Sequence, residues 1–438
     1  MKKKWTIVLL MTLLAVIMVA CSGGDVDTTN DNEGDNNGSD SSVTNDEEVT
    51  VQVWFGREDF IPDDAFETFH EENPNINVEY DVVPLEQADA DFLRNKNAGN
   101  APDIFQVFHE STQNLAAQGA VLNMSEYYDK WAEEDPDSYN KLLDQAFDIV
   151  SYEGDPYGLA IHFGPYFHVH RNDWYEEVGL DPAGPETWDD VIEHSRMIKD
   201  AGLSDYPYAT VGGSNAPPLW FSSMFVSMGG EYTDSNAPII DSEAGRYIFE
   251  WHQTMMKEEL MNPETIAWES GEMRGGFISG NVAYMPEALN IYPIIQEELN
   301  YEEQWLPTYQ PVRSGMNDYT PASFSWPMLV NSDTEHPEAV TEVLKYLSSE
   351  DISKQVALRY QPTTNEAVLL SDEFAEAHPW FERVKEGFLN SEILPSHVRQ
   401  PEIYTILNDF KQEALTDLEA DPEEVTKRYQ ELIDEIDE

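Results

Sequence analysis

The sequence predicts an α/β protein whose length suggests two domains behind a processed leader. Val49–Phe55 alternates apolar and polar side chains as a strand does, and strand-like runs follow at Ile76–Val83 and Pro102–Phe108, with helical segments between them. Strands separated by helices indicate parallel sheets with helical crossovers. The chain is 41% hydrophobic, and residues 49–438 are enough for two packed cores.

The first 21 residues predict a secretory leader that ends at a lipidated cysteine. Residues 5–20 are almost entirely apolar, follow three lysines, and stop at Cys21, the only cysteine of the chain. Met18-Val19-Ala20-Cys21 resembles the lipobox of bacterial lipoproteins, in which the cysteine is lipidated and becomes the mature N-terminus. We expect residues 1–20 to be the signal peptide; an ordinary secretory signal is the alternative.

Residues 21–48 predict a disordered acidic tether after the lipidated cysteine. Residues 22–48 contain nine acidic side chains, no basic one and almost nothing apolar. Such a stretch cannot bury enough apolar surface to offset its chain entropy.

Three later helices are marked by their first residues. Thr187-x-x-Asp190 resembles a capping box, and Pro337 and Pro422 stand where proline favours the first helical turn. We therefore expect helices to begin at these three places.

The charge of the chain excludes a nucleic-acid partner. There are 85 acidic and 24 basic residues, a formal net charge of −61, whereas phosphate contacts require basic patches. Two readings of this acidity stay open: a solvated surface that keeps an exported protein soluble, which we favour, and attraction of cationic ligands.

Motifs of catalysis are missing. The sequence contains no GxSxG, P-loop or GxGxxG motif. His168 and His170 would share one face of a strand and could bind a metal, but no third ligand is evident, so we expect a structural role. The sequence thus predicts a protein that is not an enzyme and that needs no cofactor or metal.

Aromatic residues next to polar ones follow the predicted strands. Trp54-Phe55-Gly56-Arg57-Glu58 ends the first strand, Phe108-His109-Glu110 ends the third, and Trp220 and Trp326 lie near turns. In open α/β sheets, ligands bind beyond the carboxyl ends of the strands. Aromatic faces there suit the C–H face of a sugar ring, while carboxylates, amides and imidazoles bond its hydroxyls.

These motifs together resemble the family 1 extracellular solute-binding proteins of ABC importers, such as maltodextrin-binding proteins. The resemblance runs from about residue 49 to the C-terminus. Its landmarks are Val51-x-Val53-Trp54, Pro102-Asp103-Ile104, Tyr157-Gly158-Leu159-Ala160, Pro185-Glu186-Thr187-Trp188-Asp189-Asp190, Gly229-Gly230, Phe277–Met285 and His336-Pro337-Glu338-Ala339.

The resemblance implies a two-lobe periplasmic-binding-protein-like fold of type II, with the ligand cleft between the lobes. Chain crossings are expected after Tyr157–His162, near Leu306–Pro307, and near Tyr360–Asn365. Lobe 1 would combine residues 49–163 with 306–360, and lobe 2 would combine 164–305 with 361–438.

The resemblance and the strand-end aromatic residues together give the candidate site. His109 and Glu110 match a His-Asp pair of the family, His162 stands where a glutamate contacts sugar, and Tyr404 could replace an aromatic platform. The predicted ligand-binding residues are Trp54, Phe55, Arg57, Glu58, His109, Glu110, His162, Trp220, Glu287, Asn290, Trp326 and Tyr404.

The resemblance also implies the function and the partners. We expect a monomer, lipid-anchored at the extracellular face of a Gram-positive type membrane, that captures a carbohydrate by lobe closure and delivers it to an ABC transporter permease. Arg57, His109 and His162 would permit an anionic sugar. The alternatives are a polyamine, peptide or metal ligand in the same fold and, as an enzyme, a surface glycoside hydrolase.

Overall fold

The computed structural model describes residues 48–437, apart from 215–217, 317–318 and 360–361. The predicted signal peptide, Cys21 and the tether up to residue 47 lie outside the described residues. None of the helices in the described part combines the length and apolar composition that a membrane crossing requires.

The first sheet contains the three strands that open the predicted body. Its strand order is β2-β1-β3-β11-β6, with β1 Val49–Phe55, β2 Ile76–Val82, β3 Ile104–Gln106, β6 Gly158–Leu159 and β11 Met328–Val330. Strand β1 pairs in parallel with β2 and with β3, whereas β11 runs antiparallel to β3 and β6. The predicted parallel pairing with helical crossovers is confirmed.

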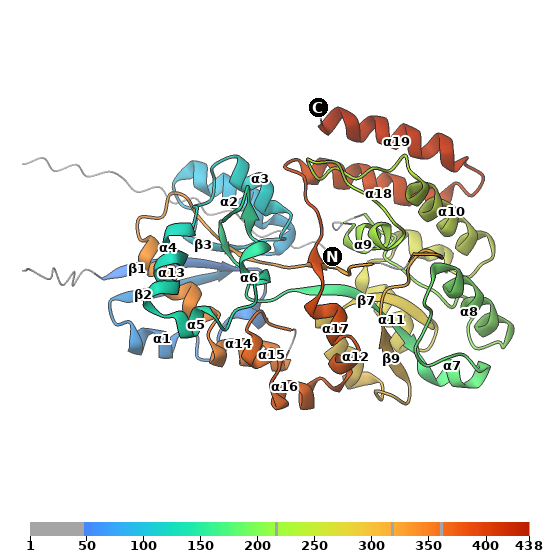
Figure 1. The fold of residues 1–438 in the computed structure, drawn as a ribbon, viewed down its shortest axis with the longest axis horizontal. Coiled ribbons are helices and arrows are strands. Elements are labelled where there is room, and N and C mark those ends of the chain that lie inside the picture. Colours follow the sequence, from blue (N-terminus) through green and yellow to red (C-terminus); the bar gives the residue numbers. More distant parts are fainter. Residues whose placement is uncertain (1–47, 215–217, 317–318, 360–361, 438) are drawn as a thin grey trace, which may run out of the picture. The chain divides into compact units, whose positions relative to one another are not determined.

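Helices and short strands surround this sheet (Figure 1). Helix α2 packs against β3, and α13 packs against β1 and α4. The elements are η1 Glu58–Phe60, α1 Glu67–Glu72, α2 Leu85–Ala98, α3 Ser111–Ala117, α4 Ser125–Glu134, α5 Pro136–Tyr139, α6 Gln145–Asp148, β4 Ser151–Tyr152, β5 Asp155–Pro156, α13 Pro337–Leu347 and α14 Glu350–Arg359.

The second sheet is built around a strand that is buried along its whole length. All eight residues of β7 Gly164–Arg171 are buried. It pairs antiparallel with β8 Tyr284–Ala288, β9 Trp305–Thr308 and β10 Ala322–Phe324, and β10 pairs in parallel with β12 Glu392–Ile393.

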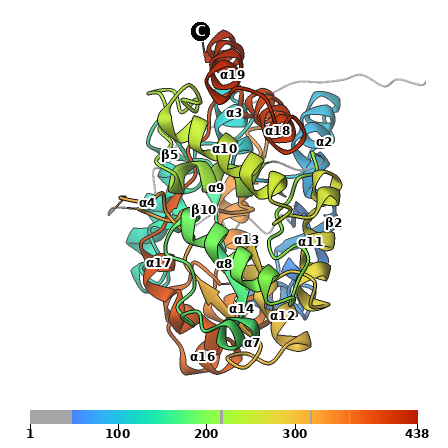
Figure 2. The same ribbon diagram turned by 90° about the vertical axis from the view of Figure 1, so that its right-hand side faces the viewer.

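Most of the remaining helices lie around this second sheet. Figure 2 shows α10, α18 and α19, which pack on one another. The elements are α7 Asn172–Val178, α8 Trp188–Asp200, α9 Leu219–Ser227, α10 Glu243–Lys257, η2 Pro263–Ala267, α11 Ser270–Ile278, η3 Leu289–Ile291, α12 Tyr292–Glu298, α15 Glu366–Leu369, α16 Asp372–Ala377, η4 Pro379–Arg383, α17 Lys385–Leu389, α18 Gln400–Thr416 and α19 Pro422–Asp437.

The predicted helix starts are confirmed. Thr187 accepts a hydrogen bond from the backbone N–H of Asp190, and the Asp190 carboxylate accepts one from the Thr187 N–H, which completes the capping box of α8. Pro337 and Pro422 are the first residues of α13 and α19.

The chain passes between the sheets at residues 160–163, from β6 to β7, and again at 325–327, from β10 to β11. The crossing expected near Leu306–Pro307 is therefore displaced, because β9 and β10 both pair with β7 and belong to the second sheet. A third segment lies beside the first crossing: Thr363 bridges to His162, and Thr364 Oγ1 donates to Ala160 O at 2.8 Å.

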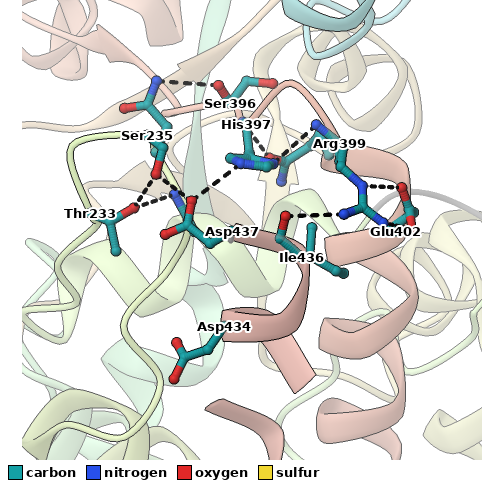
Figure 3. A network of polar contacts seen from close by, with 12 residues as sticks. Thr233, Ser235, Ser396, His397, Arg399, Glu402, Asp434, Ile436 and Asp437 are labelled. Carbon is teal, nitrogen blue, oxygen red and sulfur yellow. Dashed lines mark hydrogen bonds and ion pairs between the residues drawn. The ribbon is translucent and has the colours of Figure 1, made fainter. Parts of the chain in front are cut away.

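A polar network holds the end of α19 (Figure 3). His397 Nε2 lies 3.3 Å from Asp437 Oδ1, and Ser235 Oγ donates to the same carboxylate. Arg399 donates to Ile436 O at 3.1 Å and forms a bidentate ion pair with Glu402. The last helix is thus fastened to the start of α18 and to the loop before α10.

Candidate ligand-binding site

A cavity of about 460 Å³ collects residues from both sheets. Gly56 and Arg57 follow β1, Val82 ends β2, and Phe108 follows β3 at the carboxyl ends of these strands. The opposite wall comes from the second sheet and its neighbours, and consists of Tyr166, Leu219, Trp220, Ser270, Glu287, Ala288, Asn290, Ile291, Phe324 and Trp326. This is where open α/β sheets bind ligands.

Four aromatic side chains form one wall of this cavity. The rings of Tyr166 and Phe324 stack with centroids 4.3 Å apart, because β7 and β10 are paired strands. Trp220 lies 4.8 Å from Tyr166, and Trp326 lies 6.0 Å from Phe324. The indole N–H groups of both tryptophans have no hydrogen-bond partner among the described residues. The wall therefore offers flat apolar faces.

Glu287 is the buried charge of the cavity. It lies on β8 opposite Phe167 of β7 and is 0% exposed. Its Oε1 accepts from the backbone N–H of Ala288 at 3.0 Å, and its Oε2 lies 3.8 Å from Nη1 of Arg274. Burial raises the pKa of Glu287 to about 7, although the charge of Arg274 and the bond from Ala288 oppose this shift.

A second cavity of about 230 Å³ adjoins the first and shares Leu85, Glu86 and Phe108 with it. Glu110 lines it, with His109 Nδ1 3.0 Å from its Oε2 and the Tyr404 hydroxyl donating to its Oε1 at 3.1 Å. Burial favours a higher pKa for Glu110, but His109, its own backbone N–H and Tyr404 together lower the pKa below its usual value. This carboxylate is therefore ionised at neutral pH.

Seven predicted site residues line these cavities. Arg57, Trp220, Glu287, Asn290 and Trp326 line the larger one, and Glu110 and Tyr404 line the smaller one.

The other five line neither cavity. Phe55 is 0% exposed and packs its ring against Phe66 and Tyr80 in the core, whereas Trp54 points to the other face of the sheet, toward the core cluster of Phe105. Glu58 is exposed at the first turn of η1.

The two histidines are also displaced from the cavities. His109 lies buried beside Glu110. His162 stacks on Phe60 at 4.6 Å, with Trp326 at 5.6 Å on its edge, and burial lowers its pKa to about 3. His162 is thus neutral at physiological pH, and it packs against Trp326 without lining the cavity.

Sequence reasoning missed three aromatic residues of the site. Phe324 precedes Trp326 by two positions, a strand spacing that places both side chains on one face and could have identified it. Phe108 directly precedes the predicted pair His109 and Glu110, and its place after a strand could have identified it. Nothing in Gly164-Pro165-Tyr166 marks Tyr166, because its role depends on strand pairing.

His168 and His170 belong to the core of the second sheet. His168 stacks on Tyr284 at 4.9 Å, and His170 contacts Tyr175 at 4.3 Å. Burial lowers the pKa of each imidazole to about 3. Across the described residues, no three His, Cys, Asp or Glu side chains are placed to hold a metal ion.

Solved structures with bound sugars share the fold. Maltose-bound MalE3 of T. maritima aligns with 89% of this chain and 100% of its own (TM-score 0.74, 18% identity). A Listeria monocytogenes substrate-binding protein in complex with cycloalternan aligns with 89% and 99% (0.74, 18%). A solute-binding protein of Thermotoga lettingae with α-D-tagatose aligns with 88% and 99% (0.73, 21%). The two-lobe type II fold is therefore confirmed.

Curated relatives match over shorter segments. A probable amino-acid ABC transporter periplasmic-binding protein of Sinorhizobium fredii is 28% identical over 196 residues, 43% of either chain. An arabinooligosaccharide-binding protein of Halalkalibacterium halodurans is 24% identical over 140 residues, 31% of this chain and 30% of its own. The matched segments thus span less than half of each relative. The sequence profile of bacterial extracellular solute-binding proteins matches residues 57–354, more than half of the chain, and the protein belongs to this family.

Proposed function

We propose that the protein captures a carbohydrate of oligosaccharide size and delivers it unchanged to an ABC transporter permease. The observation that carries this proposal is the aromatic wall of Tyr166, Trp220, Phe324 and Trp326 in a cavity that both sheets line. Sugar rings present an apolar C–H face to such a wall and hydroxyls to its edges. The two adjoining cavities suit a ligand of more than one ring.

Capture would proceed by closure of the lobes. A ligand that contacts the ends of β1–β3 and also β7, β8 and β10 interacts more strongly with the closed state, and it shifts the population by that difference. We assign lobe 1 to residues 49–163 and 325–360 and lobe 2 to 164–324 and 361–438, which moves the second boundary to the observed crossing.

The protein would work as a monomer at the outer face of the membrane. Cys21 would carry the lipid anchor, and residues 22–48 would let the body reach the permease. Labelling of cells with a palmitate analogue tests this part: we expect label in the natural protein and none in Cys21→Ala, and equal labelling of both would contradict the anchor.

Calorimetry against a panel of oligosaccharides, with X-ray scattering to follow closure, tests the ligand class. In the same assay, Trp220→Ala and Trp326→Ala should each weaken binding at least about tenfold, since each removes an aromatic face worth about 0.5–1.5 kcal/mol beyond its buried area.

Trp174→Ala is the matched control, because Trp174 lies on α7 against Arg171 and lines neither cavity. Failure of every saccharide to bind would contradict the proposal, as would unchanged affinity in both cavity variants. Release of reducing ends from a bound oligosaccharide would instead favour a glycoside hydrolase.

A further inference from the structure

The two cavities of the site have an excess of negative charge. Glu86, Asp89, Glu110 and Glu287 line them, whereas among the described lining residues Arg57 is the one cationic side chain. Arg57 Nη2 forms an ion pair with Asp59 at 2.8 Å. An anionic sugar would therefore meet more repulsion than attraction from the charged side chains of the lining.

His109 and His162, which the sequence offers as contacts for an anionic sugar, add no positive charge to the lining of the two cavities. His162 lines neither cavity and is neutral. His109 also lines neither cavity, and it is buried with its Nδ1 3.0 Å from Oε2 of Glu110. The sequence-based expectation of an anionic sugar therefore depends on Arg57 alone.

The hydrogen bonding of Glu287 gives a second observation. This side chain is fully buried, lines the larger cavity, and its Oε2 accepts no hydrogen bond from any described residue. Arg274 Nη1, at 3.8 Å, is too distant for a hydrogen bond to this oxygen. A buried acceptor without a donor is unfavourable, and a ligand donor that reached Oε2 would remove that penalty.

We propose that the ligand is a cationic amino sugar whose ammonium group donates to Glu287 Oε2 while its ring lies on the aromatic wall. This inference rests on the proposed carbohydrate function and narrows its ligand class. An ammonium group supplies three donors, no acceptor and one positive charge, which matches both the vacant acceptor and the acidic lining. The ring face packs on Trp220 and Trp326, and the remaining hydroxyls extend into the smaller cavity.

Calorimetry of matched sugar pairs at pH 7 tests the inference. The pairs are glucosamine and glucose, galactosamine and galactose, mannosamine and mannose, and the β-1,4-linked disaccharides of glucosamine and of glucose. In at least one pair, the amino sugar should bind about tenfold or more tightly than its neutral partner. Equal affinities within every pair that binds would overturn the inference but leave the proposed function standing; binding of no sugar would contradict the proposed function itself.

Two variants separate a specific contact from general attraction to an acidic protein. Glu287→Gln keeps the shape of the side chain and removes its charge, so the preference for the amino sugar should fall to about twofold or less. Glu298→Gln removes one charge at the exposed end of α12 and should keep the full preference. Persistence of the preference in Glu287→Gln would overturn the inference.

Proton release gives a readout that needs no variant. Because Glu287 has a pKa of about 7 in the free protein, a cation at its Oε2 should lower that pKa and expel part of a proton on binding. The binding enthalpy of the amino sugar should then depend on the ionisation enthalpy of the buffer, and that of the neutral sugar should not. Buffer-independent enthalpies for the amino sugar would count against the contact with Glu287.

Discussion

Replacement of His168 by phenylalanine should stabilise the protein, and more so in acid. His168 lies on β7 with its ring stacked on Tyr284 and the edge of Trp188 at 5.3 Å. Neither ring nitrogen has a hydrogen-bond partner among the described residues, and the side chain is 1% exposed. A phenyl ring keeps the stacking and removes two unpartnered polar atoms.

The expected gain in unfolding free energy has one contribution that is independent of pH and one that depends on pH. Removing an unsatisfied buried polar group gains about 1–3 kcal/mol, from which about 1 kcal/mol is subtracted for the slightly larger ring. Burial holds the folded-state pKa of His168 at about 3, against 6.5 in the unfolded chain, so below pH 6.5 the unfolded state takes up a proton that the folded state refuses. At pH 5 this proton uptake lowers the unfolding free energy of the natural protein by about 2 kcal/mol, and the variant has no such loss.

Urea unfolding at pH 8 and pH 5, followed by tryptophan fluorescence, measures both parts. His252→Phe is the matched comparison, because burial lowers its pKa to about 4 but its Nδ1 bonds to Ile248 O at 2.7 Å. The His252→Phe variant should show the same pH-dependent gain in unfolding free energy at pH 5, but no gain at pH 8. If the advantage of His168→Phe is equal at both pH values, the imidazole is charged in the folded protein and the reasoning is refuted.

Three further predictions concern a helix cap, a close approach and the smaller cavity. Thr187→Ala removes the side-chain acceptor of the α8 cap and should lower the unfolding free energy by about 1 kcal/mol in urea titrations, whereas Thr187→Ser should not. Gly158→Ala would bring its Cβ to 2.0 Å from Met328 O, so it should cost about 1–3 kcal/mol or more and lower the thermal midpoint; a stability equal to that of the natural protein would show that β11 gives way without cost. Tyr404→Phe deletes the donor to Glu110 Oε1, so the pKa of Glu110 should rise and the pH profile of binding should shift upward, and an unshifted profile would place Glu110 outside the bound state.

The parts of the fold that local patterns specify were predicted correctly. Alternation in Val49–Phe55 identified β1, and the residues before α8, α13 and α19 identified their starts, because strand pleat and helix capping depend on neighbours in sequence. The crossing near Leu306–Pro307 was misplaced because the pairing of β9 with β7 joins residues more than 130 positions apart.

Only some of the predicted site residues line the two cavities, for the same physical reason. The sequence predicts a ligand platform where an aromatic ring ends a strand, but Phe55 and Trp54 alternate into two cores. No local signal shows which face of a central strand is covered. The burial of His162 depends on Phe60 and Trp326, which come from distant parts of the chain. Trp220, at the start of α9, and Trp326, between β10 and β11, line the larger cavity.

The segments that join the two halves are bonded to one another as well as to their own strands. Ser325 Oγ donates to His162 O at 2.6 Å, and Thr363 Oγ1 and Thr364 Oγ1 donate to Ile161 O and Ala160 O. Because bending one connection alone would break these bonds, we expect the connections to move together. We therefore expect the empty protein to sample few relative orientations of its halves, which would reduce the entropy lost when a ligand is captured.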